Sequence, residues 1–260
     1  MTTKFQDEQM LTLPRLLCKQ AEVLGRGAVA IREKAYGVWH TYNWDDYLRY
    51  VRHTALGLAS LGVRRGENVV LVVNNHPEWL FSELGAQAIG AVTINLFTSS
   101  IPEELRTSLQ RAQAVIVVAQ DQEQVDKLIE IRARIPQVRK VIYLDPTGMR
   151  SYREESWLQS YADLLSAGEE KEQREPDYFS REINRGNAKD IALMIQTSGT
   201  TGVSKLAMLS HRSMIAMGRQ WTQAIALERG ENWLSMSPPA WIVDQMWGMG
   251  VSLYSGMTMN

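Results

Sequence analysis

The stretch DIALMIQTSGTTGVSKLAML, residues 190–209, holds two apolar runs separated by a loop of hydroxyl residues and glycine that ends in Lys205. The runs 190–195 and 206–209 predict a buried strand and a strand that returns beside it. Glycine permits backbone conformations in which successive amide groups converge on an anion, and hydroxyls and an ammonium group add further phosphate ligands. The sequence therefore predicts a phosphate-binding loop between two strands, which favours an enzyme that uses ATP.

Two other kinds of phosphate-binding loop are excluded by the same stretch. A Walker A loop requires G-x-x-x-x-G-K-[ST] between a strand and a helix. Counting from Gly199, Ser204 occupies the position of the second glycine, and Leu206 follows the lysine. No G-x-G-x-x-G follows a predicted strand, which excludes the dinucleotide fingerprint. An ordinary surface turn stays open as the alternative, because Ser, Thr and Gly are common in turns.

The motif T-S-G-T-T-G-x-x-K, together with Met208-Leu209-Ser210-His211 after it, resembles the signature of the adenylate-forming acyl-CoA synthetases. Further segments similar to that family are 66–75, 90–96 and 232–241, so the resemblance covers nearly the whole chain. The run Ala240–Gln245 resembles the long-chain fatty acid branch. Ser204 and Leu206 stand where members usually carry proline and glycine, and these departures affect the loop geometry rather than the phosphate ligands.

This resemblance implies that a fatty, long-chain carboxylic acid is activated with ATP to an acyl-adenylate and then to an acyl-CoA, with Mg2+ and coenzyme A taking part. It implies catalytic roles for Lys205 and Thr200. The residues that it implies for nucleotide binding are Thr197, Ser198, Gly199, Thr200, Thr201, Gly202, Lys205 and His211. Trp241 is implied to lie beside the substrate carboxyl group. A helix-start role for His211 and a plain core position for Trp241 are the alternatives.

The composition of the chain argues against several classes of function. A net charge of −1 gives no electrostatic case for binding nucleic acid. No run of about 18 apolar residues predicts a membrane span, and the N-terminus lacks the apolar core of a signal peptide. We therefore expect a cytoplasmic protein whose membrane association, if any, is peripheral. The single Cys18 falls in an amphipathic pattern and predicts a buried side chain rather than a nucleophile. Asp244 has no second carboxylate at ligand spacing, so we predict no protein-held metal site.

Alternating apolar strands and amphipathic helices predict an α/β fold with a mainly parallel sheet layered with helices. The expected elements are a hairpin over 29–44, a helix capped by Asn43, strands at 69–73, 92–95, 115–118 and 140–144, and helices from Pro77, over 103–111 and over 122–135. Residues 1–145 would form an α/β subdomain, and 146–189 a charged connection with one short helix. Residues 190–260 would supply the strand pair of the phosphate loop, a helix after Ser210 and the start of the next α/β unit.

The chain is shorter than the enzymes that it resembles, because the resemblance implies a longer enzyme with a separate C-terminal domain. We expect these 260 residues to be the N-terminal part of the large domain, truncated before the C-terminal domain and inactive alone. A catalytically incomplete nucleotide-binding or interaction fragment is one alternative. An aryl or medium-chain acid-CoA ligase is the other.

Overall fold

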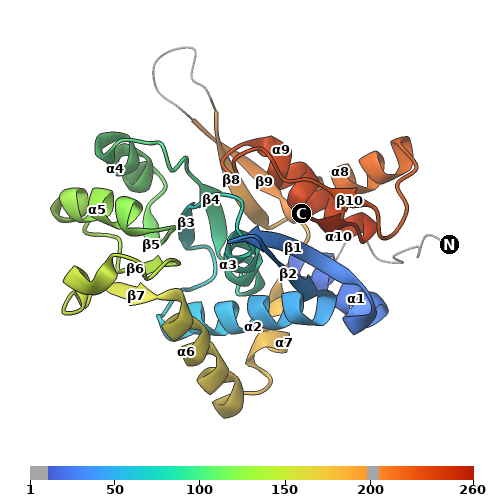
Figure 1. The fold of residues 1–260 in the computed structure, drawn as a ribbon, viewed down its shortest axis with the longest axis horizontal. Coiled ribbons are helices and arrows are strands. Elements are labelled where there is room, and N and C mark those ends of the chain that lie inside the picture. The colour runs from blue at the N-terminus through green and yellow to red at the C-terminus, as the bar shows by residue number, and fades with distance from the viewer. Residues whose placement is uncertain (1–10, 198–204) are drawn as a thin grey trace.

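The computed structural model describes residues 11–197 and 205–260, in which strands and helices alternate (Figure 1). The strands are β1 (Val29–Ala35), β2 (Val38–Asn43), β3 (Asn68–Val72), β4 (Val92–Asn95), β5 (Ala114–Ala119), β6 (Lys140–Tyr143), β7 (Leu158–Ser160), β8 (Ile191–Thr197), β9 (Lys205–Ser210), β10 (Asn232–Trp233) and β11 (Thr258–Met259). The helices are α1 (Leu13–Leu24), α2 (Trp44–Ser60), α3 (Pro77–Ala88), α4 (Pro102–Arg111), α5 (Gln122–Ile131), α6 (Tyr161–Arg174), α7 (Tyr178–Arg185), α8 (His211–Ala224), α9 (Ile242–Asp244), the π-helix η5 (Gln245–Val251) and α10 (Ser252–Ser255). Short 3-10 helices cover Gly25–Gly27, Arg132–Arg134 and Met149–Tyr152.

The larger sheet has seven strands in the order β7-β6-β5-β3-β4-β8-β9. Every neighbouring pair is parallel except β8 and β9, which form the antiparallel strand pair expected around the phosphate loop. β8 pairs with β4, so residues after 190 continue the sheet that the first half of the chain begins. The expected α/β class with a mainly parallel, helix-layered sheet is confirmed.

Helices cover both faces of this sheet, because successive residues of its strands point to opposite sides. On β3, Val69 and Leu71 belong to the core shared with α1, α2 and α3. Val70 and Val72 belong to a second core shared with α4 and α5. Strands buried on both faces read as continuous apolar runs, which is why the sequence shows them so clearly.

A smaller sheet, β10-β11-β1-β2, joins the two ends of the described chain. Its β1–β2 hairpin turns at Tyr36-Gly37, where φ is 50° and 82°, as a two-residue type I′ turn requires. β11 adds to β1 in parallel. After the hairpin, α2 begins with a capping box in which Asn43 accepts from the backbone N–H of Asp46 at 2.8 Å. The predicted hairpin and cap are both present.

The segment 146–189 corrects the expectation of a charged connection with one short helix. It contains β7, which extends the large sheet, and two helices, α6 and α7. α6 packs along α2, where Gly57 faces the backbone of Leu164 and Gly168 faces the backbone of His53. Its charged residues conceal an amphipathic pattern, with Tyr161 and Leu164 buried on one side. A high charge content thus describes the outer faces of these helices rather than a loop.

Replacing Gly168 by alanine is expected to lower the free energy of unfolding by about 2 kcal/mol. The new Cβ would clash with the carbonyl group of His53, and a backbone atom cannot turn aside as a flexible side chain can. Urea denaturation followed by circular dichroism measures the loss. Gly27→Ala is the control, because nothing lies within 4 Å of the added Cβ there. Equal stability of the two variants would contradict the close approach of α6 to α2.

Candidate functional site

The candidate site lies at the edge of the large sheet where its parallel strands end. Ligands of open α/β sheets bind outside the carboxyl ends of the strands. Thr197 is the last residue of β8, which runs parallel to β4, so the predicted phosphate loop begins at that edge (Figure 1). Of the residues implied for nucleotide binding, Ser198, Gly199, Thr200, Thr201 and Gly202 lie outside the described residues. Thr197, Lys205, His211 and Trp241 can be placed.

Thr197 and Trp241 line the same pocket, which has a volume of about 790 Å³. The end of β8 forms one part of its wall, and Phe97, which follows β4, forms another. Trp241 and its two neighbours close a third side, and one face of α4, including Glu104, completes the lining. Residues far apart in the sequence therefore enclose a space beside the start of the predicted phosphate loop.

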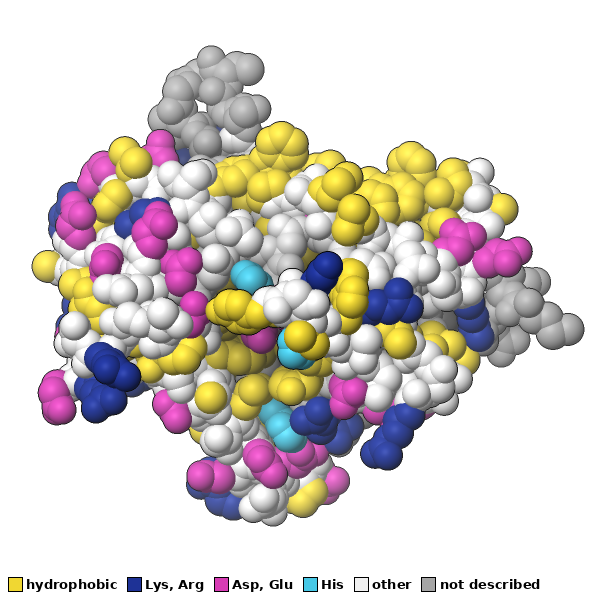
Figure 2. Space-filling model, viewed as in Figure 1, with side chains coloured by type: hydrophobic (Ala, Val, Ile, Leu, Met, Phe, Trp, Pro, Cys, Tyr) yellow, Lys and Arg dark blue, Asp and Glu magenta, His cyan; other side chains and the backbone are white. Residues whose placement is uncertain are grey.

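Trp241 is not a plain core residue. Its side chain is 55% exposed, and its ring meets that of Phe97 edge to face, with 6.5 Å between ring centroids and an interplanar angle of 87°. Leu234, Met236 and Ile242 are further exposed apolar side chains near it in sequence. Figure 2 shows hydrophobic side chains gathered along the upper edge of the molecule, over the region of α9. An exposed indole on the pocket wall contradicts the alternative of a core position for Trp241.

Lys205 begins β9 and pairs with Thr197 across the hairpin. The hydroxyl group of Thr197 donates to the carbonyl oxygen of Lys205 at 3.3 Å, which closes the base of the loop. The Lys205 side chain is exposed and lines a neighbouring pocket of about 410 Å³. Arg111 lines both pockets. The structure thus places Thr197 in the larger pocket and Lys205 beside it.

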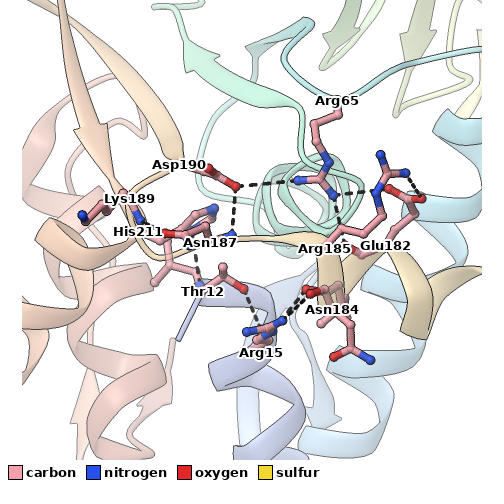
Figure 3. Close-up of polar contacts among 12 residues, drawn as sticks. Thr12, Arg15, Arg65, Glu182, Asn184, Arg185, Asn187, Lys189, Asp190 and His211 are labelled. Carbon is pink, nitrogen blue, oxygen red and sulfur yellow. Dashed lines mark hydrogen bonds and ion pairs between the residues drawn. The ribbon is translucent and has the colours of Figure 1, made fainter. Parts of the chain in front are cut away.

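His211 lies at the opposite end of the same hairpin. At about 3.3 Å per residue, the six steps along the chain from Lys205 to His211 span about 20 Å. Its ring is buried, and its Nδ1 accepts a hydrogen bond from the backbone N–H of Leu13 at 3.2 Å (Figure 3). Ser210 caps α8, as the sequence predicted. This geometry agrees with the alternative of a helix-start residue, and we leave His211 out of the proposed nucleotide contacts.

Two buried carboxylates, Asp244 and Glu83, lie outside the lining of the pocket, and Glu83 was not singled out in the sequence. Asp244, considered above as a metal ligand, accepts hydrogen bonds from Asn75 at 2.7 Å, Ser235 at 3.0 Å and the indole of Trp233 at 3.2 Å. Burial raises its pKa, and these hydrogen bonds act in the opposite direction. Glu83 is likewise fully buried. The one feature of the sequence that could have indicated a buried Glu83 is its position among the apolar residues of a helix.

Within 11–197 and 205–260, no three His, Cys, Asp or Glu side chains gather as a metal site. None of the helices in that part of the chain is long and apolar enough to cross a bilayer.

The matched family covers most of the chain. Residues 18–260 match the family described as AMP-binding enzyme. The chain belongs to this family. The AMP-binding chain is 32% identical over 177 residues to the long-chain-fatty-acid-CoA ligase heimdall of Drosophila melanogaster, and 29% identical over 199 residues to the long-chain-fatty-acid-CoA ligase ACSBG1 of Bos taurus. These alignments cover 68% and 76% of this chain but 26% of each relative. The predicted family is confirmed.

Solved structures agree with the fold. An anthranilate CoA ligase, AuaEII, in complex with anthranoyl-AMP has a TM-score of 0.80 at 18% identity, covering 96% of this chain and 44% of that one. The N-terminal domain of FACL13 from Mycobacterium tuberculosis has a TM-score of 0.76 at 20% identity, covering 96% of this chain and 57% of that one. The described fold is therefore that of the N-terminal portion of such enzymes.

Proposed function

We propose that the protein carrying this chain activates a long-chain fatty acid with ATP to an acyl-adenylate and then to an acyl-CoA. The observation that supports this proposal most directly is the pocket that brings Thr197, at the start of the phosphate loop, together with Trp241 and Phe97. The chain would supply the phosphate-binding half of the site, with residues 198–202 and Lys205 around the phosphates. Similarity to long-chain-fatty-acid-CoA ligases supports this substrate class. The proposal places this activity in the cytoplasm and is compatible with peripheral membrane contact.

The chemistry explains why the loop is needed. In the first step a carboxylate oxygen of the fatty acid forms a bond to the α-phosphorus of ATP, and pyrophosphate leaves. In the second step the thiol sulfur of coenzyme A bonds to the acyl carbon, and AMP leaves. Because an anion approaches a polyanion in the first step, amide groups and the Lys205 ammonium must offset the phosphate charge. Mg2+, which is usually bound through substrate phosphates with few protein ligands, would supply further positive charge.

Replacing Lys205 by alanine in the protein that carries this chain is expected to slow pyrophosphate release about 30-fold, equivalent to ~2 kcal/mol of transition-state stabilisation. The measurement is fatty-acid-dependent release of pyrophosphate from ATP. Lys189→Ala is the matched control, because it removes the same charge near the other end of the β8–β9 hairpin. An unchanged rate in the Lys205 variant would remove Lys205 from this role.

The substrate class can be tested in the same assay. Palmitate, hexanoate and benzoate present long aliphatic, medium aliphatic and aryl carboxylates to the wild-type protein. A preference for palmitate is the expected result. A preference for hexanoate or benzoate would replace the long-chain assignment by one of the alternatives. ATP binding without pyrophosphate release from any acid would overturn the proposal in favour of a nucleotide-binding fragment.

A further inference from the structure

The two aromatic residues of the pocket wall share one buried anchor, although they lie on different parts of the chain. Phe97 stands two residues after Asn95, whose side-chain amide donates to Glu83 at 2.9 Å. Trp241 stands two residues after Pro239, whose carbonyl oxygen accepts from Gln245 at 2.9 Å. The same amide nitrogen of Gln245 donates to Glu83 at 3.1 Å. Glu83 thus connects the backbone on both sides of the Phe97–Trp241 contact.

Glu83 is suited to hold these segments because it is fully buried on α3 and both of its carboxylate oxygens accept hydrogen bonds. Its Oε2 accepts from the indole of Trp79 at 2.6 Å, in addition to Asn95 and Gln245, and its Oε1 accepts from the hydroxyl of Thr93 at 2.9 Å. Hydrogen bonds to a buried charged group are stronger and more directional than those to an exposed one. Glu83 is therefore a rigid point of attachment behind the pocket.

Gln245 carries this attachment to the turn that bears Trp241. It is fully buried as the first residue of the π-helix η5, a helix type that is frequent at functional sites. The turn itself is closed by a hydrogen bond from the backbone N–H of Trp241 to the carbonyl oxygen of Pro238 at 2.8 Å. With Pro239 held by Gln245, the Trp241 indole is attached to a fixed backbone although the residue is 55% exposed.

We propose that Gln245 is a positioning residue that fixes the indole of Trp241 as a wall of the pocket through its hydrogen bonds to Glu83 and Pro239, and so sets which acyl groups the pocket accepts. The second part rests on the proposed function, since it assumes that the pocket receives the acyl-adenylate. A fixed aromatic wall discriminates between acyl chains by size, whereas a mobile indole accommodates each of them.

The positioning itself can be tested without ligand. The chain is labelled with 5-fluorotryptophan, and the 19F resonance of Trp241 is identified by its absence from a Trp241→Phe variant. Gln245→Met keeps the side-chain volume but removes both hydrogen bonds, and it is expected to broaden or shift the Trp241 resonance. The resonance of Trp157, whose indole donates to the carbonyl oxygen of Val138, should not change. Gln245→Asn, which draws the amide back by one methylene, should act similarly if the methionine variant does not fold.

Gln87→Met is the matched control for the loss of a buried amide. Gln87 belongs to the same network, through a hydrogen bond to Thr93 at 3.1 Å, but has no bond to Pro239. Its variant should leave the Trp241 resonance as in wild type. A wild-type Trp241 resonance in the Gln245 variants, or an equal change in the Gln87 variant, would overturn the positioning role.

Selectivity is tested with acyl-sulfamoyl adenosines, which mimic acyl-adenylates and carry long or short acyl chains. Calorimetry gives the dissociation constant of the short-chain compound divided by that of the long-chain compound. This ratio is expected to fall about tenfold in Gln245→Met and to stay constant in Gln87→Met. A constant ratio in the Gln245 variant would overturn the selectivity role alone. If the wild-type chain binds neither compound, the proposed use of the pocket fails, whereas the 19F result still decides whether Gln245 positions Trp241.

Discussion

Replacing Glu83 by methionine is expected to lower the free energy of unfolding by roughly 3–5 kcal/mol. Four buried donors lose Glu83 as an acceptor. The Gln245 amide and the Thr93 hydroxyl keep a second acceptor, the carbonyl oxygens of Pro239 at 2.9 Å and Ala192 at 3.3 Å, so the loss falls mainly on the Trp79 indole and the Asn95 amide. Burial raises the pKa of Glu83, which shows that the carboxylate itself is costly to bury, while the hydrogen bonds from Gln245, Asn95, Thr93 and Trp79 offset that cost. Methionine would remove the cost of burying a charge and leave the larger cost of the unpaired donors.

The loss is measured by urea denaturation followed by far-UV circular dichroism. Glu170→Met, at an exposed position on α6, is the matched control and should change the free energy of unfolding by no more than about 0.5 kcal/mol. A Glu83 variant as stable as this control would mean that the four donors find other partners. In that case Glu83 could not be the common anchor of Phe97 and Trp241.

The parts of the fold that local sequence determines were predicted closely. The strand expected at 69–73 is β3 at Asn68–Val72, and the helix expected after Ser210 is α8. A strand buried on both faces, a side-chain cap and a Tyr-Gly turn each leave a signal within a few residues. The segment 146–189 was the exception. The one short helix expected there corresponds to α6, whereas β7, of three residues, and α7, of eight, are too short to give a clear periodic pattern and were not predicted.

The site was harder to predict because its contacts join distant residues. Thr197 and Trp241 were selected from motifs, and the structure places both on one pocket. Phe97 lies in that pocket only because β4 and β8 are neighbours in the sheet. Glu83 and Gln245 meet across 162 positions of the chain, a contact that no short pattern records. The nucleotide contact expected for His211 rested on its nearness in sequence to the phosphate loop, whereas the structure places His211 at the far end of β9 from Lys205.

His211 instead fastens the start of α8 to the start of α1. Its backbone N–H donates to the carbonyl oxygen of Asp190 at 3.1 Å, while its Nδ1 accepts from Leu13 at the first turn of α1. Burial lowers the pKa of His211 to about 4. The Asp190 carboxylate raises this pKa, whereas the Arg65 guanidinium, which lies 3.7 Å from that carboxylate, lowers it further. Figure 3 shows these three side chains at the junction. The folded chain therefore holds a neutral imidazole that the unfolded chain would protonate.

The stability of the chain should consequently fall as the pH drops from 6.5 to about 4, the two pKa values of the unfolded and folded states. Below pH 6.5 the unfolded chain binds a proton that the folded chain does not, so the contribution of His211 is complete above pH 6.5 and is reduced by about 3 kcal/mol at pH 4. Urea denaturation at several pH values measures it. His211→Asn is the control, because an amide oxygen can replace Nδ1 as the acceptor for Leu13 but does not titrate. Since other groups titrate in both proteins, the difference between the two curves isolates His211, and parallel curves would contradict a buried neutral imidazole.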